Sequence, residues 1–143
     1  MNKLKGESKI KDKEGIMHKI LIVEDNDSNL ETMKVYCQES FPGVGIVVTK
    51  DGNAAISELS RDSFDLILLD VNIPQGPGVA VLKYIKNTYK NRMSDVVLVS
   101  GYLDHSVVNY AKSLGVTKFL DKPFSANELV DCHKGKGSDI SVK

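Results

Sequence analysis

The sequence predicts an α/β fold, built as a three-layer, doubly wound parallel sheet with a (βα)5 order of elements. Two observations lead to this class. Five apolar runs alternate along the 143-residue chain with segments in which apolar residues recur at helical spacing. Three of these runs are apolar almost throughout, which is typical of parallel strands covered by helices on both faces. Strands and helices that alternate in this way form open parallel sheets with right-handed crossovers.

The five apolar runs are the expected strands. In order, they are Lys19–Val23, Gly45–Lys50, Phe64–Asp70, Asp95–Ser100 and Thr117–Asp121. The first, third and fourth are the almost continuously apolar ones. We expect the flavodoxin-like strand order 2-1-3-4-5, in which the first and third strands are neighbours. In such sheets ligands bind beyond the carboxyl ends of the strands.

Two capping boxes mark the first and the last expected helix. Ser28 with Glu31, and Ser125 with Glu128, are each spaced so that the serine oxygen can accept a backbone N–H while the glutamate reaches back. The last helix should be short, because glycine interrupts it at Gly135 and glycine disfavours helix by about 1 kcal/mol relative to alanine.

Three further helices are expected in the middle of the chain. The second and third cover Asn53–Ser60 and Val79–Thr88. The fourth carries an apolar stripe that ends at Gly115, where the left-handed conformation favours glycine. The residues of that stripe are Val107, Val108, Ala111 and Leu114.

The length fits one domain between two tails. We expect a charged tail over residues 1–18, a folded domain over residues 19–133 and a disordered tail over residues 134–143. The first tail lacks the apolar segment of a secretory signal, and no run approaches the roughly 18 apolar residues of a membrane span. The expectation is therefore a cytoplasmic chain without membrane contact.

The net charge is zero, but the charges are unevenly distributed. Residues 20–131 carry ten basic and fifteen acidic side chains, a net charge of −5, which argues against direct binding of nucleic acid. Cys37 and Cys132 have no metal-ligand spacing and are expected as reduced thiols. His18, His105 and His133 lack such spacing as well and are expected at the surface.

Polar side chains stand at the carboxyl ends of four of the expected strands. Glu24 and Asp25 follow the first strand, Asp70 ends the third, Ser100 ends the fourth, and Lys122 follows the fifth. The three carboxylates should converge, and like charges at short distance repel one another. Mg²⁺ would remove that repulsion, since it binds to a few carboxylates while keeping several waters. Calcium fits less well, because no loop supplies its six to eight oxygens.

The stretches "ILIVEDND", "LILLDVNIPQGPG", "VLVSGY" and "TKFLDKPF", in this order, resemble the CheY-like receiver domain of two-component response regulators. The resemblance extends from Lys19 to Asp131. It is specific, because Asp70, Ser100 and Lys122 are separated by 30 and 22 residues, as are the phosphoacceptor, hydroxyl and lysine of that family.

For the phosphoryl group, the resemblance implies a role for each of five residues. Asp70 would be the nucleophile that takes a phosphoryl group from a phosphohistidine. Lys122 and Ser100 would bind phosphoryl oxygens, and a cis bond before Pro123 would aim the lysine. Ser100 and Phe119 would form the switch, with Phe119 in the place of the more common tyrosine.

For the metal, the resemblance implies a Mg²⁺ site. Asp25 and Asp70 would hold the ion directly, Glu24 through water, and Asn72 through its backbone carbonyl. Such an ion offsets charge on the transferring phosphoryl group. Tyr102 is expected to flank the path of water to the acyl phosphate and to slow its hydrolysis.

The implied function is that of a signalling module rather than an enzyme. The phosphoryl donor would be a sensor histidine kinase or a phosphotransfer protein. An unidentified downstream protein would bind to the face made by the fourth helix, the fifth strand and the fifth helix. That face is expected to include His105, Val108, Lys118 and Leu120. We expect a monomer or a weak dimer that depends on phosphorylation.

Two alternatives stay open from the sequence. One is an adaptor that keeps the fold and binds partners without phosphorylation. The other is a Mg²⁺-dependent phosphohydrolase with an aspartyl nucleophile, as in haloacid-dehalogenase-like phosphatases. Asn72 argues against the second, because that family normally has an aspartate two residues after its nucleophile.

Overall fold

The computed structural model describes residues 17–71, 78–89, 93–101 and 105–135, in which five strands form one parallel sheet of order β2-β1-β3-β4-β5. The strands are β1 (Lys19–Val23), β2 (Gly45–Thr49), β3 (Leu66–Asp70), β4 (Val96–Ser100) and β5 (Lys118–Asp121). The helices are α2 (Asp27–Ser40), α3 (Gly52–Arg61), α4 (Gly78–Tyr89), α5 (His105–Leu114) and α6 (Ala126–His133), with a short 3-10 helix η2 at Met93–Asp95. The predicted fold class and strand order are confirmed.

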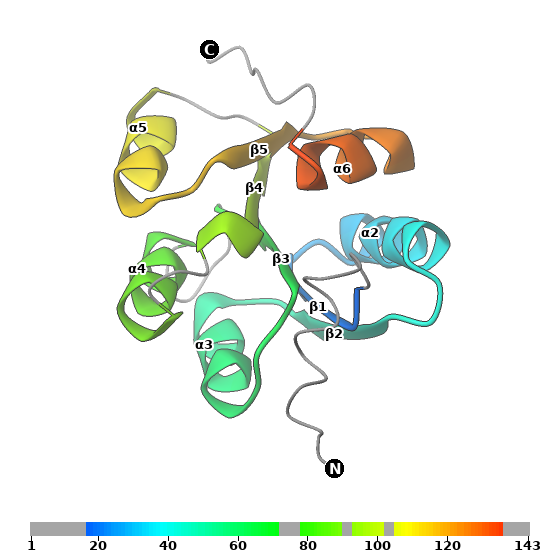
Figure 1. Ribbon diagram of the computed structural model, residues 1–143, viewed down its shortest axis with the longest axis horizontal. Coiled ribbons are helices and arrows are strands. Elements are labelled where there is room, and N and C mark those ends of the chain that lie inside the picture. Colours follow the sequence, from blue (N-terminus) through cyan, green and yellow to red (C-terminus); the bar gives the residue numbers. More distant parts are fainter. Residues whose placement is uncertain (1–16, 72–77, 90–92, 102–104, 136–143) are drawn as a thin grey trace.

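The helices cover both faces of the sheet. Figure 1 shows α2 and α6 on one side, and α3, α4 and α5 on the other. β1 contributes side chains to the core on both faces of the sheet, because successive side chains of a strand point to opposite faces. Leu21 and Val23 pack in the core under α3, α4 and α5, while Ile20 and Ile22 pack in the core under α2 and α6. Every residue of β3 and β4 is buried, as the apolar runs predicted.

The third strand begins two residues later than predicted, and Asp65 supplies the reason. Its Oδ2 atom accepts the backbone N–H groups of His18 at 2.8 Å and Lys19 at 3.0 Å. The carboxylate thereby satisfies donors at the start of β1, and the strand proper starts at Leu66. Phe64 precedes β3 and is nevertheless buried in the core.

One predicted capping box is wrong and the other is confirmed. α2 begins at Asp27, because the Oδ1 atom of Asn26 accepts the backbone N–H of Asn29 at 2.8 Å and so caps the helix before Ser28. At α6, the Oγ atom of Ser125 accepts the N–H of Glu128 at 3.1 Å, and Glu128 accepts the N–H of Ser125 at 2.8 Å. α6 has eight residues, so the short last helix is confirmed.

Two glycines meet specific demands of the backbone. Gly115 has a φ angle of 109°, which confirms the predicted left-handed end of α5. At Gly78, the first residue of α4, a Cβ atom would lie 2.7 Å from the Cα atom of Val71. A side chain there would collide with backbone, so glycine allows α4 to start close to the end of β3.

Several surface predictions need correction. His18 and His105 are exposed as expected, but His133 is half-buried, because its ring packs edge-on against Phe41 at 5.7 Å between centroids. Val108 and Leu120, expected on a binding face, are only 1% and 8% exposed because they pack in the core.

Cys37 and Cys132 are both buried, and both are free thiols. Among the described residues, no helix has the length and apolar character needed to cross a bilayer. Most of the two predicted tails, residues 1–16 and 136–143, lies outside the described residues, and the domain limits stay predictions.

Candidate functional site

The carboxyl ends of the strands bring the predicted site residues to one edge of the sheet. Glu24 follows β1 directly, Asp70 is the last residue of β3, and Ser100 is the last residue of β4. Backbone hydrogen bonds fix these ends. The N–H of Glu24 donates to the carbonyl of Thr49 at 3.0 Å, and the N–H of Lys122 donates to the carbonyl of Ser100 at 2.9 Å. The side chains therefore project from a rigid frame.

Lys122 lies between two buried carboxylates. Its Nζ atom is 2.7 Å from Oε1 of Glu24 and 3.0 Å from Oδ2 of Asp70. The side chains of Glu24 and Asp70 are 1% and 6% exposed, so water screens neither charge well. Glu24 is held from a second side, because its Oε2 atom accepts the N–H of Asn26 at 3.1 Å. The lysine thus makes it possible for two carboxylates to lie buried at the same edge.

The charge of Lys122 is set by two opposing effects. Burial disfavours the ammonium ion and by itself lowers the pKa of Lys122, while the hydrogen bonds and the charges of Glu24 and Asp70 favour it. The carboxylates together outweigh burial and raise the pKa of Lys122 above its ordinary value. Lys122 is therefore a fixed cation at neutral pH, available to bind an anionic oxygen.

Three carboxylates at this edge fit a magnesium ion. Glu24, Asp25 and Asp70 each offer one oxygen, and these oxygens lie within 4.8 Å of one another. Asp25 is exposed while the other two are buried, so the group opens to solvent on one side. With Lys122 counted, the four side chains carry a net charge of −2, which a divalent cation would balance. The predicted backbone ligand, Asn72, lies outside the described residues.

The two residues expected to form the switch, Ser100 and Phe119, occupy buried positions. Ser100 is 0% exposed and ends the strand next to β3, where Asp70 pairs with Val99 in register. Phe119, on β5, is 5% exposed and packs in the core under α5. The ring therefore points inward in this structure. Tyr102 lies outside the described residues, so its proposed effect on hydrolysis stays a prediction.

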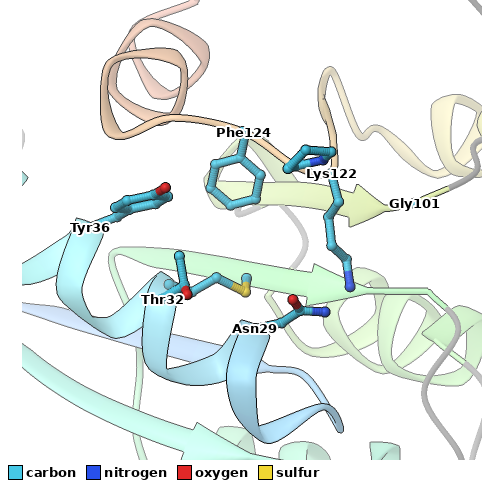
Figure 2. Close-up of a pocket in the computed structure, with 8 residues that line it drawn as sticks. Asn29, Thr32, Tyr36, Gly101, Lys122 and Phe124 are labelled. Carbon is cyan, nitrogen blue, oxygen red and sulfur yellow. The ribbon is translucent and has the colours of Figure 1, made fainter.

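The bond between Lys122 and Pro123 is cis, as predicted, and Pro123 is exposed. The segment after it forms one wall of a pocket of about 440 Å³ that opens next to Lys122. Figure 2 shows this pocket between α2 and the segment that joins β5 to α6, with the Lys122 side chain at one end. Its lining comprises Asn29, Thr32, Met33, Tyr36, Gly101, Lys122, Pro123 and Phe124.

The sequence reasoning missed the pocket and the role of Asn26. The only signal of the pocket is the spacing of Asn29, Thr32 and Tyr36, which recur on one face of α2 at intervals of a helical turn. Tyr36 packs against Phe124, with ring centroids 5.8 Å apart. Asn26 stood in an acidic stretch with several residues able to cap a helix, so nothing singled it out.

Comparison with known proteins agrees with this geometry. The family model described as "Response regulator receiver domain" matches residues 20–134. The transcriptional regulatory protein CpxR of Escherichia coli K12 is 32% identical over 114 residues, which cover 80% of this chain and 47% of CpxR. The chain thus corresponds to slightly under half of that relative.

Solved structures share the fold. The chemotaxis response regulator CheY4 of Vibrio cholerae superposes with a TM-score of 0.73 at 25% identity, covering 83% of this chain and 98% of CheY4. The receiver domain of the sensor histidine kinase PA1611 from Pseudomonas aeruginosa PAO1 has a TM-score of 0.72 at 23% identity, covering 83% of this chain and 96% of its own. That structure is described as having a magnesium ion coordinated in its active site cleft.

Proposed function

Because the chain belongs to the response regulator receiver domain family of two-component systems, we propose that it accepts a phosphoryl group on Asp70 and signals the change to a partner protein. One observation supports this most strongly. The Nζ atom of Lys122 lies within hydrogen-bonding distance of both Glu24 and Asp70, at the open edge of a rigid sheet. A lysine ammonium and two further carboxylates that could help to hold a metal ion thus lie around the carboxylate of Asp70.

In the proposed reaction, a carboxylate oxygen of Asp70 forms a bond to phosphorus while the bond from phosphorus to the imidazole nitrogen of a phosphohistidine breaks. The electron pair of that bond stays with the imidazole, which is restored to its neutral form by a proton. Asp70 is well placed for this, because its strand is fully buried and holds the carboxylate in one position. The product is an aspartyl phosphate.

Lys122 would stabilise the transferred group. Its ammonium already lies 3.0 Å from an oxygen of Asp70, so an oxygen of the incoming phosphoryl group can share this donor. Asp25, Asp70 and Glu24 would hold Mg²⁺, with the carbonyl of Asn72 as a further ligand. When bound, Mg²⁺ supplies positive charge that offsets the charge of the phosphoryl oxygens.

The proposed output is a change of shape. The buried hydroxyl of Ser100 would turn to donate to a phosphoryl oxygen, and Phe119 on the neighbouring strand would be held more fully in the inward position that it already occupies. Exposed His105 and half-buried Lys118 belong to the face that a partner would read. We propose a sensor histidine kinase or phosphotransfer protein as donor, an unidentified protein as receiver, a cytoplasmic location, and a monomer or weak dimer that depends on phosphorylation.

Incubation with acetyl phosphate and Mg²⁺, followed by intact-mass measurement, tests the proposal. The wild-type chain should gain one phosphoryl group, and Asp70→Asn should gain none. Asp51→Asn is a matched control, since Asp51 caps α3 after the neighbouring strand β2 and asparagine caps a helix equally well. This control should be phosphorylated like the wild type.

The two alternatives give different results in the same experiment. An adaptor that needs no phosphate would show no adduct under any of these conditions, and this would overturn the proposal. A phosphohydrolase would instead turn over para-nitrophenyl phosphate many times per chain, which a receiver does not do.

A further inference from the structure

Lys112, on α5, lies over the ring of Phe119. Its Nζ atom is 6.0 Å from the ring centroid, which is within the range of a cation–π contact. Lys112 is exposed, so its ammonium is in water while its aliphatic stem can cover the ring. Val108 and Ala111 of the same helix are buried in the core that contains the ring. Helix, lysine and ring therefore form one packed unit.

The backbone of Phe119 is fixed on both sides. On one side Phe119 pairs in register with Leu98 of β4. On the other side its carbonyl accepts the thiol of Cys132, on α6, at 3.5 Å. Any switching movement at this position is therefore a rotation of the side chain. Phenylalanine has no hydroxyl that could bind a partner at the end of its ring, so among the described residues core packing and the Lys112 charge favour the inward position.

We propose that Lys112 is a positioning residue that holds Phe119 inward before any phosphoryl group is bound. The position of the ring does not depend on the proposed function. Only its consequence rests on that function, namely that the output face of the resting chain is biased towards its signalling arrangement. An outward rotation would remove the ring from the core and would also separate it from the ammonium. The charge of Lys112 thus adds to the preference for the inward ring position that core packing already provides.

The test measures the position of the ring directly, by ¹⁹F NMR of chains labelled with fluorophenylalanine. The signal of Phe119 among the four phenylalanines is assigned with Phe119→Leu. Lys112→Met keeps the length of the side chain and removes the charge. It should increase the outward population about two- to five-fold, as expected for loss of an exposed cation–π contact. Lys112→Arg keeps a cation and should restore the wild-type population.

Lys83→Met serves as the matched control, because Lys83 is an exposed lysine on α4. It should leave the Phe119 signal unchanged. The proposal is overturned if Lys112→Met shows the wild-type ring population, including the case of one inward signal in both proteins. It is also overturned if Lys112→Arg behaves like Lys112→Met, because the charge would then have no part in the effect.

Phosphorylation by acetyl phosphate is measured on the same samples. Failure of Asp70 to accept a phosphoryl group in the wild-type chain would contradict the proposed function and leave the ring measurement intact. An unchanged ring population in a chain that is phosphorylated normally would contradict only the role of Lys112.

Discussion

Lys122 Nζ lies 2.7 Å from Oε1 of Glu24, a residue 98 positions earlier in the chain. This contact joins the end of β1 to the segment after β5, although β3 and β4 lie between these two strands in the sheet. The same ammonium also contacts Asp70, at the end of β3. Two nearly unexposed carboxylates both pair with this one ammonium. The stability of the chain and its proposed chemistry are therefore linked at this residue.

Lys122→Met should destabilise the chain in metal-free buffer, because Glu24 and Asp70 would remain buried without their cation. We expect a loss of about 1–3 kcal/mol in the free energy of unfolding, measured by urea denaturation. Added Mg²⁺ should recover part of the loss. The same exchange at exposed Lys86 on α4 should change little, and equal losses at the two lysines would contradict the account.

Mg²⁺ should raise the melting temperature of the wild-type chain, since it would bind to the folded state through Glu24, Asp25 and Asp70. Asp25→Asn removes one carboxylate from this group and should greatly reduce the increase, as measured by calorimetry with and without Mg²⁺. Asp27→Asn is the control. Asp27 is also exposed and lies two residues further along the chain, but it pairs with Lys50 at 2.5 Å, so its loss should leave the response to Mg²⁺ intact.

Gly78→Ala should destabilise the fold by about 1–3 kcal/mol, because the new Cβ atom would lie 2.7 Å from the Cα atom of Val71. Backbone cannot move aside as a flexible side chain can. Gly101→Ala is the control, since no atom of the described part of the chain beyond its immediate neighbours lies within 4 Å of the Cβ position there. Urea denaturation that ranks the two variants in the opposite order would refute the close approach of α4 to β3.

The Cys37 thiol should make the chain less stable in alkali. Burial raises the pKa of Cys37 from 9.0 to about 12, so the unfolded chain releases this proton before the folded chain does. Stability is unaffected below pH 9 and should fall from there to about pH 12, by at most about 1.4 kcal/mol per pH unit. The free energy of unfolding is measured against pH for the wild type and for Cys37→Ala, and the difference between the two curves isolates the contribution of the thiol. Curves that stay parallel from pH 9 to pH 12 would show that this contribution is absent.

Much of the site could be predicted because strand ends are easy to find in this sequence. The apolar runs stop at Asp70 and Ser100, and parallel topology then places both residues at one edge. The side-chain chemistry at those ends, a carboxylate and a hydroxyl, could be read directly. The cis bond before Pro123 followed from the family resemblance rather than from any local signal.

The start of α2 was predicted wrongly because several neighbouring residues could each cap the helix. The stretch from Asn26 to Asn29 has a residue able to cap a helix at every position. The side chain of Asn26 is the one that caps α2, while its backbone N–H donates to Glu24. That contact also holds a site residue in place, and spacing in the sequence gives no sign of it.

Other differences came from tertiary packing. His133 is half-buried because the α6 helix on which it lies packs beside α2, next to Phe41. Periodicity identified the apolar face of α5, but it could not reveal that the ammonium of Lys112 would lie over the ring of Phe119 on β5. The bridge from Lys122 to Glu24 was also missed, because the family pattern gives the lysine only a role with the phosphoryl group.

Mapping of the acyl phosphate is the most direct test of the central claim. The chain is incubated with a small phosphodonor and Mg²⁺, reduced with borohydride, digested and sequenced by mass spectrometry. Borohydride converts an aspartyl phosphate to homoserine, so the account predicts homoserine at position 70 and at no other aspartate. Intact Asp70 after this treatment, or homoserine at Asp25 instead, would contradict it.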